Sequence, residues 1–143
     1  GMCIGGPYIL NLLKLAPQRV VASVVMQTIG RDNNRQEFLA MFDGWADQLH
    51  QSDPQRYGSE AMLGLRRRMF ENDLTFMCMT ESQVQELDAP MLILDGADTY
   101  HPAASSQRLA ELQPQAERIH EWKLPPELEV AADRVLGFFR DHL

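Results

Sequence analysis

The stretch "GMCIGGP", residues 1–7, has the composition of a sharp turn between a buried strand and a helix. Glycines at positions 1 and 5 would let the strand and the helix approach where a Cβ atom would clash, and the turn would impose strained dihedral angles on Cys3. Pro7 suits the first turn of a helix, because the N–H that proline lacks has no partner there. The thiol of Cys3 would then lie at a helix N-terminus, whose dipole favours the reactive thiolate. Cys3 is therefore a candidate nucleophile.

The sequence that follows this turn alternates between helical and strand patterns. Apolar residues at helical spacing predict a helix over 7–17, and the β-branched run "RVVASVVMQTIG" at 19–30 predicts a strand buried on both faces. Such alternation predicts an α/β fold with about three parallel strands flanked by helices. The later predicted elements are strands at 89–96 and 116–122 and helices at 102–114 and 126–143.

Residues 33–87 contain no convincing strand and interrupt this alternation. Apolar residues spaced three or four apart predict two amphipathic helices, one on each side of the polar break at 52–58. Thr80 and Gln83 have the spacing of a capping box, which predicts the start of a third helix. We therefore expect a single α/β domain over 1–143 that carries a helical, cap-like insertion at 33–87.

Composition excludes several classes of partner. The net charge of −7 disfavours a nucleic-acid-binding surface, and the one basic cluster, Arg66–Arg68, is either a solvated helix face or a site for an anion or a partner. No apolar run approaches the roughly 20 residues needed to cross a bilayer, and no signal peptide is visible. Cys3 and Cys78 are too few for a disulfide framework and lack zinc-ligand spacing, and Cys78 lies in an apolar stretch typical of a buried thiol. We expect a cytoplasmic protein with no metal, no organic cofactor, and no nucleic-acid or membrane partner.

The order of these parts resembles the C-terminal half of an α/β-hydrolase, beginning at the nucleophile elbow. The elbow of that family is Gly-x-Ser-x-Gly, and "GMCIGG" matches it with Cys3 in the place of the nucleophile. Dienelactone-hydrolase-like members use cysteine there and often carry a second glycine, as Gly6 is here. The segment "PMLILDGADTYHP" at 90–102 is similar to the family's acid strand and loop, with Asp98 in the place of the triad acid. The resemblance covers nearly the whole chain and implies a partial α/β-hydrolase fold.

The same resemblance implies the hydrolysis of a small ester or lactone. Cys3 would attack the carbonyl carbon of this small carbonyl substrate, and the backbone N–H of Ile4, the residue after the nucleophile, would donate to the oxyanion. Asp98 would orient the catalytic base, although Gly-x-Asp after a strand is also ordinary Asx-turn chemistry. The helical insertion could provide an apolar roof over the substrate, and the candidate residues for it are Phe42, Trp45, Met62 and Met69.

The catalytic base departs from the family pattern. The family places a histidine in the loop before the terminal helix, and the corresponding segment 121–130 contains none. His101 lies three residues after Asp98 and could serve as the base for Cys3, while the alternative is a loop histidine that satisfies local hydrogen bonds. His50, at a helix end of the insertion, is expected to be structural. His120, which the sequence places within a strand, is expected to be structural too.

The strands that precede the elbow in the family, and the loop that supplies half of the oxyanion hole, have no counterpart in this sequence. We therefore expect a truncated chain, whose missing half an upstream reading frame could encode. It would act either as a weak hydrolase or as a non-catalytic remnant or interaction module. Three strands are near the lower limit for an independent sheet, and the strand at 19–30 would expose an apolar edge. We expect a homodimer that forms through this edge or through the apolar faces that the missing half would cover.

Overall fold

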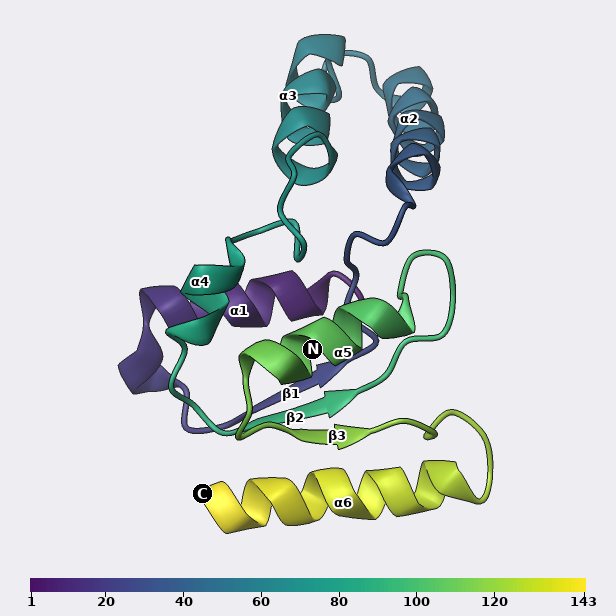
Figure 1. Ribbon diagram of the computed structural model, residues 1–143. Helices are drawn as coiled ribbons and strands as arrows, with labels where there is room; N and C mark the ends of the chain where they lie inside the picture. Colours follow the sequence, from purple (N-terminus) through teal and green to yellow (C-terminus); the bar gives the residue numbers. More distant parts are fainter.

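The computed structural model describes residues 1–143 and has a parallel sheet at its centre (Figure 1). The central strand is β2, which is hydrogen-bonded to β1 on one side and to β3 on the other. The predicted α/β fold with three parallel strands is therefore confirmed. The strands are β1 (Ser23–Met26), β2 (Met91–Leu94) and β3 (Glu117–Ile119).

Every helix predicted from apolar spacing is present. The strand predicted at 19–30 is shorter than its apolar run, because a 3-10 turn occupies Pro17–Arg19 and the backbone leaves the sheet at Gln27, whose φ is 38°. The helical elements are α1 (Gly5–Leu15), η1 (Pro17–Arg19), α2 (Arg35–Ser52), α3 (Ser59–Phe70), α4 (Glu81–Gln85), α5 (Ala103–Leu112) and α6 (Glu127–His142).

Helices cover both faces of the sheet (Figure 1). Val25 and Ile93 belong to a buried cluster with residues of α1, α4 and α5, whereas Val24 and Leu92 belong to a cluster with Phe138 of α6. Successive strand residues point to opposite faces, so β1 and β2 each contribute to both clusters. This arrangement explains why these two strands are near-continuous apolar runs and not alternating ones.

The helices α2 and α3 form a hairpin that stands away from the sheet (Figure 1). Phe38 and Phe42 of α2 and Phe70 of α3 pack with Ile29 and Met77 in a third buried cluster at the base of this hairpin. The short helix α4, part of the same expected insertion, instead packs beside the sheet, since its buried residues share the cluster of α1 and α5. The hairpin is therefore the part of residues 33–87 that stands away from the sheet.

The predicted capping box is present at the start of α4. The Thr80 side chain accepts from the backbone N–H of Gln83, and the Gln83 side chain accepts from the backbone N–H of Thr80. Each of these bonds satisfies a backbone donor that the first turn of a helix leaves free. The sequence pattern thus located the start of a five-residue helix that has no amphipathic repeat of its own.

The first residues of the chain pair with the outer edge of β1. Met2 and Met26 form a parallel bridge, Met26 N–H donates to the Gly1 carbonyl at 2.9 Å, and Cys3 N–H donates to the Met26 carbonyl at 3.1 Å. The edge that the sequence predicted to be bare is therefore partly occupied by the segment before α1. Val24 and Val25 of β1 are buried, and the exposed apolar residues near this edge are Met2 and Val21.

Candidate active site

Cys3 lies at the tip of a strand–turn–helix connection. Its φ of 59° is in the left-handed region, which is uncommon for residues other than glycine and concentrates at functional sites. Two short-range hydrogen bonds hold the turn, from Gly5 N–H to the Met2 carbonyl at 2.8 Å and from Gly6 N–H to the Cys3 carbonyl at 3.1 Å. The backbone strain expected of Cys3 from the sequence is present in the structure.

The close approach of the backbone predicted at Gly1 is present, but the one predicted at Gly5 is not. A Cβ atom on Gly1 would lie 2.9 Å from the Gly5 carbonyl oxygen, which is tighter than side chains tolerate. A Cβ on Gly5 would meet nothing within 4 Å, whereas a Cβ on Gly6 would clash with the side chain of Thr28. Gly6 is therefore the second required glycine, because it lets α1 pack on the loop that follows β1.

The backbone N–H of Ile4 is unused at this turn. Ile4 precedes the first residue of α1, and no backbone acceptor bonds its N–H. The neighbouring N–H groups of Gly5 and Gly6 are both engaged. An unpaired backbone donor directly after Cys3 is a suitable partner for a developing negative charge.

Asp98 and His101 are in direct contact in the loop that follows β2. The His101 Nδ1 atom lies 2.8 Å from Asp98 Oδ1 and 3.0 Å from Oδ2. The backbone N–H groups of Tyr100 and His101 also donate to Asp98 Oδ1, each at 3.0 Å, so the predicted Asx-type turn exists together with the side-chain pair. Burial would raise the pKa of Asp98, but the hydrogen bonds from His101 and Tyr100 outweigh it and hold the pKa below its ordinary value.

The far ring nitrogen of His101 has no partner. With Nδ1 bound to Asp98, His101 Nε2 is buried and makes no hydrogen bond. The loop geometry around it is tight, because a Cβ atom on Gly96 would clash with the His101 carbonyl oxygen. His101 is thus a histidine that a carboxylate orients and whose second ring nitrogen is buried without a hydrogen-bond partner.

The loop of Asp98 and His101 and the turn that carries Cys3 both border the cluster at the base of the α2–α3 hairpin. Cys3 and Tyr100 both pack against the cluster at the base of the α2–α3 hairpin. The Asn34 side chain joins the loops after β1 and β2 by donating to the Gly30 carbonyl at 3.0 Å and to the Thr99 carbonyl at 2.7 Å. Cys3 Sγ makes no hydrogen bond to His101 in this structure, so the two side chains are unbonded.

A second aspartate–histidine pair was missed by the sequence analysis. Asp95, buried just after β2, accepts from Arg118 Nε and Nη2, both at 2.8 Å, and lies 3.0 Å from His120 Nδ1. His120, predicted to lie within a strand, is the first residue after β3. The signal was available, because Arg118 and His120 are two positions apart and therefore share one side of an extended chain.

The remaining candidates have structural surroundings. His50 Nδ1 lies 2.9 Å from the Tyr57 carbonyl oxygen, as suits a histidine that closes the α2–α3 connection. Burial raises the pKa of Cys78 to about 11, in agreement with the expected inert thiol. In the basic cluster, Arg66 is paired with Asp43 and Glu71, whereas its two neighbours are exposed on α3.

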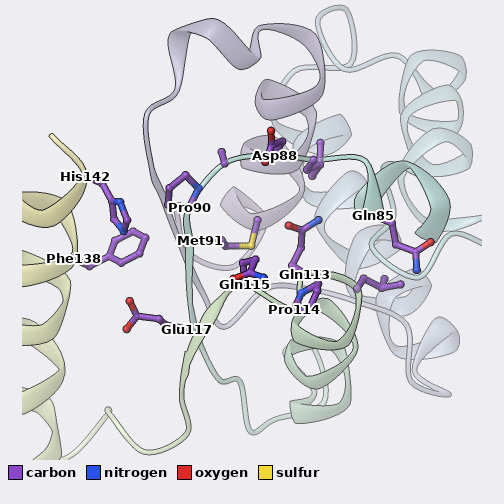
Figure 2. Close-up of a pocket in the computed structure, with 13 residues that line it drawn as sticks. Gln85, Asp88, Pro90, Met91, Gln113, Pro114, Gln115, Glu117, Phe138 and His142 are labelled. Atoms are coloured by element: carbon purple, nitrogen blue, oxygen red, sulfur yellow. The ribbon is translucent and has the colours of Figure 1, made fainter.

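A hollow of about 480 Å³ lies at the end of the sheet where β2 and β3 begin, opposite to the end that carries Cys3 (Figure 2). Phe138 and His142 of α6 face Pro90 and Met91 across it, and Glu117 lies beside them. This end of the sheet is remote from Cys3, which lies at the carboxyl ends of the strands.

No three His, Cys, Asp or Glu side chains gather closely enough to hold a metal ion. None of the helices combines the length and apolar character needed to span a bilayer.

No protein-family model and no curated protein matches this sequence, but solved structures do. BpoC of Mycobacterium tuberculosis, described as a candidate non-heme bromoperoxidase, matches 100% of the chain with a TM-score of 0.66 and 18% identity. Est816, an N-acyl homoserine lactone degrading enzyme, matches 96% with a TM-score of 0.59 and 18% identity. An α/β hydrolase from Sphaerobacter thermophilus matches 97% with a TM-score of 0.55 and 14% identity.

The chain forms part of the α/β-hydrolase fold. It spans 66% of the length of BpoC and 65% of each of the other two structures. At these identities the likeness establishes the fold and leaves the chemistry to the residues themselves. Within the α/β-hydrolase fold, Cys3 and the Asp98–His101 pair lie beyond the carboxyl ends of the strands, where open parallel sheets place their ligands.

Proposed function

We propose that this chain hydrolyses a small carboxylic ester or lactone, with Cys3 as nucleophile, His101 as general base and Asp98 as the carboxylate that orients it. The observation that carries the proposal is the Asp98–His101 pair, whose Nε2 is buried without a partner and which, like Cys3, lies beyond the carboxyl ends of the strands. A buried ring nitrogen without a hydrogen-bond partner lowers the free energy of unfolding, and such an unpaired group is typical of a catalytic residue. Est816, which shares the fold, degrades a lactone, and this agrees with the proposed class of substrate.

The reaction has two steps. In the first, Cys3 Sγ bonds to the carbonyl carbon, its proton passes to His101 Nε2, and the alcohol leaves with that proton, so that a thioester forms on Cys3. In the second, His101 takes a proton from water, which attacks the thioester, and the acid is released as the Cys3 thiol is restored. The Ile4 N–H donates to the oxyanion in both steps. Contact between Cys3 Sγ and His101 Nε2 would form on substrate binding, since catalytic hydrogen bonds are often loose before it.

His101 is a better base than His120 for a physical reason. A carboxylate assists a histidine base by stabilising the imidazolium that forms during the reaction. The Asp98 carboxylate has no other charged partner, whereas the Asp95 carboxylate already pairs with Arg118 in two hydrogen bonds. The side chain of His120 is also 68% exposed, against 15% for His101. The proposal therefore assigns His120 to the link between β2 and β3.

Turnover by this chain is expected to be slow. The Ile4 N–H is one oxyanion donor, and removal of one donor from a complete oxyanion hole costs about 100- to 1000-fold in turnover. Cys3 acylation is then easier to detect than steady-state hydrolysis. The assay should therefore measure both.

The test uses p-nitrophenyl butyrate with the wild-type chain, Cys3→Ala and Cys78→Ala. We expect p-nitrophenolate release and one butyryl group on the peptide that contains Cys3, seen by mass spectrometry. Cys78→Ala removes only the second thiol and should still carry the butyryl group on Cys3, whereas Cys3→Ala should lose both signals. Hydrolysis by Cys3→Ala at the wild-type rate would contradict the proposal.

The second candidate function is a non-catalytic module that forms a homodimer. One observation favours it: the outer face of α1 and the adjacent edge are apolar and exposed, although β1 itself is partly paired. The exposed side chains are Met2, Tyr8, Leu12, Leu15 and Val21. Tyr8, Leu12 and Leu15 follow helical spacing, so they form one stripe. A dimer without any Cys3 acylation would favour this function over the hydrolase.

A further inference from the structure

A hollow of about 210 Å³ lies between the start of α1 and the C-terminal half of α3. Seven of its ten lining residues are hydrophobic. A hollow of this size suits a short chain and not a long one. The apolar residues that matter for the argument are Ile4, Ile29, Leu65, Met69 and Met77.

The hollow begins one residue away from Cys3. Ile4, which follows Cys3, forms part of its wall. Ile29 also lines it, and the Ile29 N–H donates to the Cys3 carbonyl at 3.4 Å. Cys3 itself packs against the cluster that contains Ile29 and Met77. Cys3 is therefore adjacent in sequence to one wall residue and hydrogen-bonded through its backbone to another, which places the hollow beside the turn that carries Cys3.

Arg68 is the one charged residue among those that line the hollow. The other polar members, Tyr8 and Asn11, are uncharged, and burial raises the pKa of Cys78 to about 11, so its thiol is neutral near pH 7. Arg66 of the same basic cluster is neutralised by Asp43 and Glu71, but Arg68 makes no salt bridge within the chain. In a chain of net charge −7, this leaves a cation at an apolar hollow available to an external anion.

We propose that this hollow binds the substrate chain and that Arg68 selects substrates whose short apolar chain ends in a carboxylate. The inference rests on the proposed function, because it names the substrate class of the same site. A guanidinium recognises a carboxylate through charge and through paired N–H donors. The apolar wall holds the methylene groups between the reacting carbonyl and that carboxylate.

The test measures the alkylation of Cys3, which needs binding and a thiol but no turnover. It is done in a Cys78→Ala chain, because Cys78 also lines the hollow. The reagents are iodoacetamide, N-butyl iodoacetamide and 4-(iodoacetamido)butanoate; in each reaction an S–C bond forms, iodide leaves and the thiol proton is released. We expect the anionic reagent to alkylate Cys3 at least tenfold faster than the neutral butyl reagent. Arg68→Gln should abolish that difference, and Arg67→Gln, on the exposed neighbour that does not line the hollow, should keep it.

Leu65→Trp provides a second measurement, since the larger side chain should fill the hollow and slow both chain-bearing reagents more than it slows iodoacetamide. Equal rates for the three reagents would overturn the inference, as would an Arg67→Gln effect as large as that of Arg68→Gln. The two proposals fail separately. Reagent selectivity without any ester turnover would count against the hydrolase alone, and ester turnover without selectivity would count against Arg68 alone.

Discussion

At the scale of single residues, the two cysteines should differ in reactivity because their surroundings differ. Burial raises the pKa of Cys78 to about 11, so only about one Cys78 in ten thousand is a thiolate at pH 7. Cys3 lies in the turn before the eleven-residue helix α1, where the proposed function places the nucleophile. With limiting iodoacetamide at pH 7, we expect Cys3 to be alkylated at least tenfold faster than Cys78, as measured by peptide mass spectrometry. Equal and slow labelling of the two would undercut the assignment of Cys3 as nucleophile.

The charge of Asp98 should make stability depend on pH. Its pKa in the folded chain lies below the ordinary value of 3.8, because hydrogen bonds from His101 and Tyr100 outweigh burial. The stabilisation is therefore fully present above pH 4 and is lost as the pH falls through the lowered pKa. Urea unfolding of the wild type and Asp98→Asn between pH 5.5 and pH 2.5 tests this. The wild type should lose its advantage as the pH falls, and an advantage that stays constant would contradict the contact.

The stability of the fold should depend on glycine at position 96 but not at position 44. A Cβ atom on Gly96 would clash with the backbone of His101, whereas one on Gly44, exposed in α2, would meet nothing within 4 Å. We expect Gly96→Ala to lower the free energy of unfolding by about 1–3 kcal/mol through overpacking. Gly44→Ala should raise it by up to about 1 kcal/mol, since alanine is the better helix former. Equal effects in urea unfolding would mean that the loop after β2 is looser than described.

At the scale of elements, a buried ion pair joins the ends of β2 and β3. The Asp95 side chain is 7% exposed and accepts two hydrogen bonds from Arg118, while the comparable pair of Arg108 and Glu81 has side chains 43% and 37% exposed. Loss of one partner leaves a buried charge unpaired, so Arg118→Met should cost about 2–4 kcal/mol. Arg108→Met removes a solvated pair and should cost about 1 kcal/mol or less. Similar losses in thermal unfolding of the two variants would show that burial does not decide this contribution.

The sequence predicted elements better than it predicted contacts. Helices and strands follow from local patterns, such as the apolar runs of β1 and β2 and the Thr80–Gln83 capping box, and these were found where expected. Contacts between elements depend on how the chain packs, which is why Gly5 was named where Gly6 is required, and why the Asp95–His120 pair was missed. The strand at 19–30 was predicted too long because the apolar residues Val20–Ala22 before β1 and Ile29 in the loop after it have the same sequence character as a strand.

At the scale of the whole molecule, the apolar face of α1 should mediate self-association. Tyr8 is 65%, Leu12 49% and Leu15 79% exposed, and no other element of the chain covers them. We expect a dimer in light scattering at micromolar concentration, and Leu12→Glu should make it monomeric by placing a charge in the interface. Leu136→Glu, on the exposed side of α6 at 53% exposure, is the control and should leave the dimer intact. A wild-type monomer at this concentration would contradict the prediction.

The central claim is that His101, oriented by Asp98, activates Cys3. The most direct test compares the rate of Cys3 acylation by p-nitrophenyl butyrate in the wild type, His101→Ala and His120→Ala, with added imidazole as a rescue. Loss of a general base typically costs about 100- to 10,000-fold, so His101→Ala should fall by at least 100-fold and should recover in part with imidazole. His120→Ala should stay within about threefold of the wild type. Acylation that survives in His101→Ala but is lost in His120→Ala would contradict the account and would place the base at the Asp95 pair.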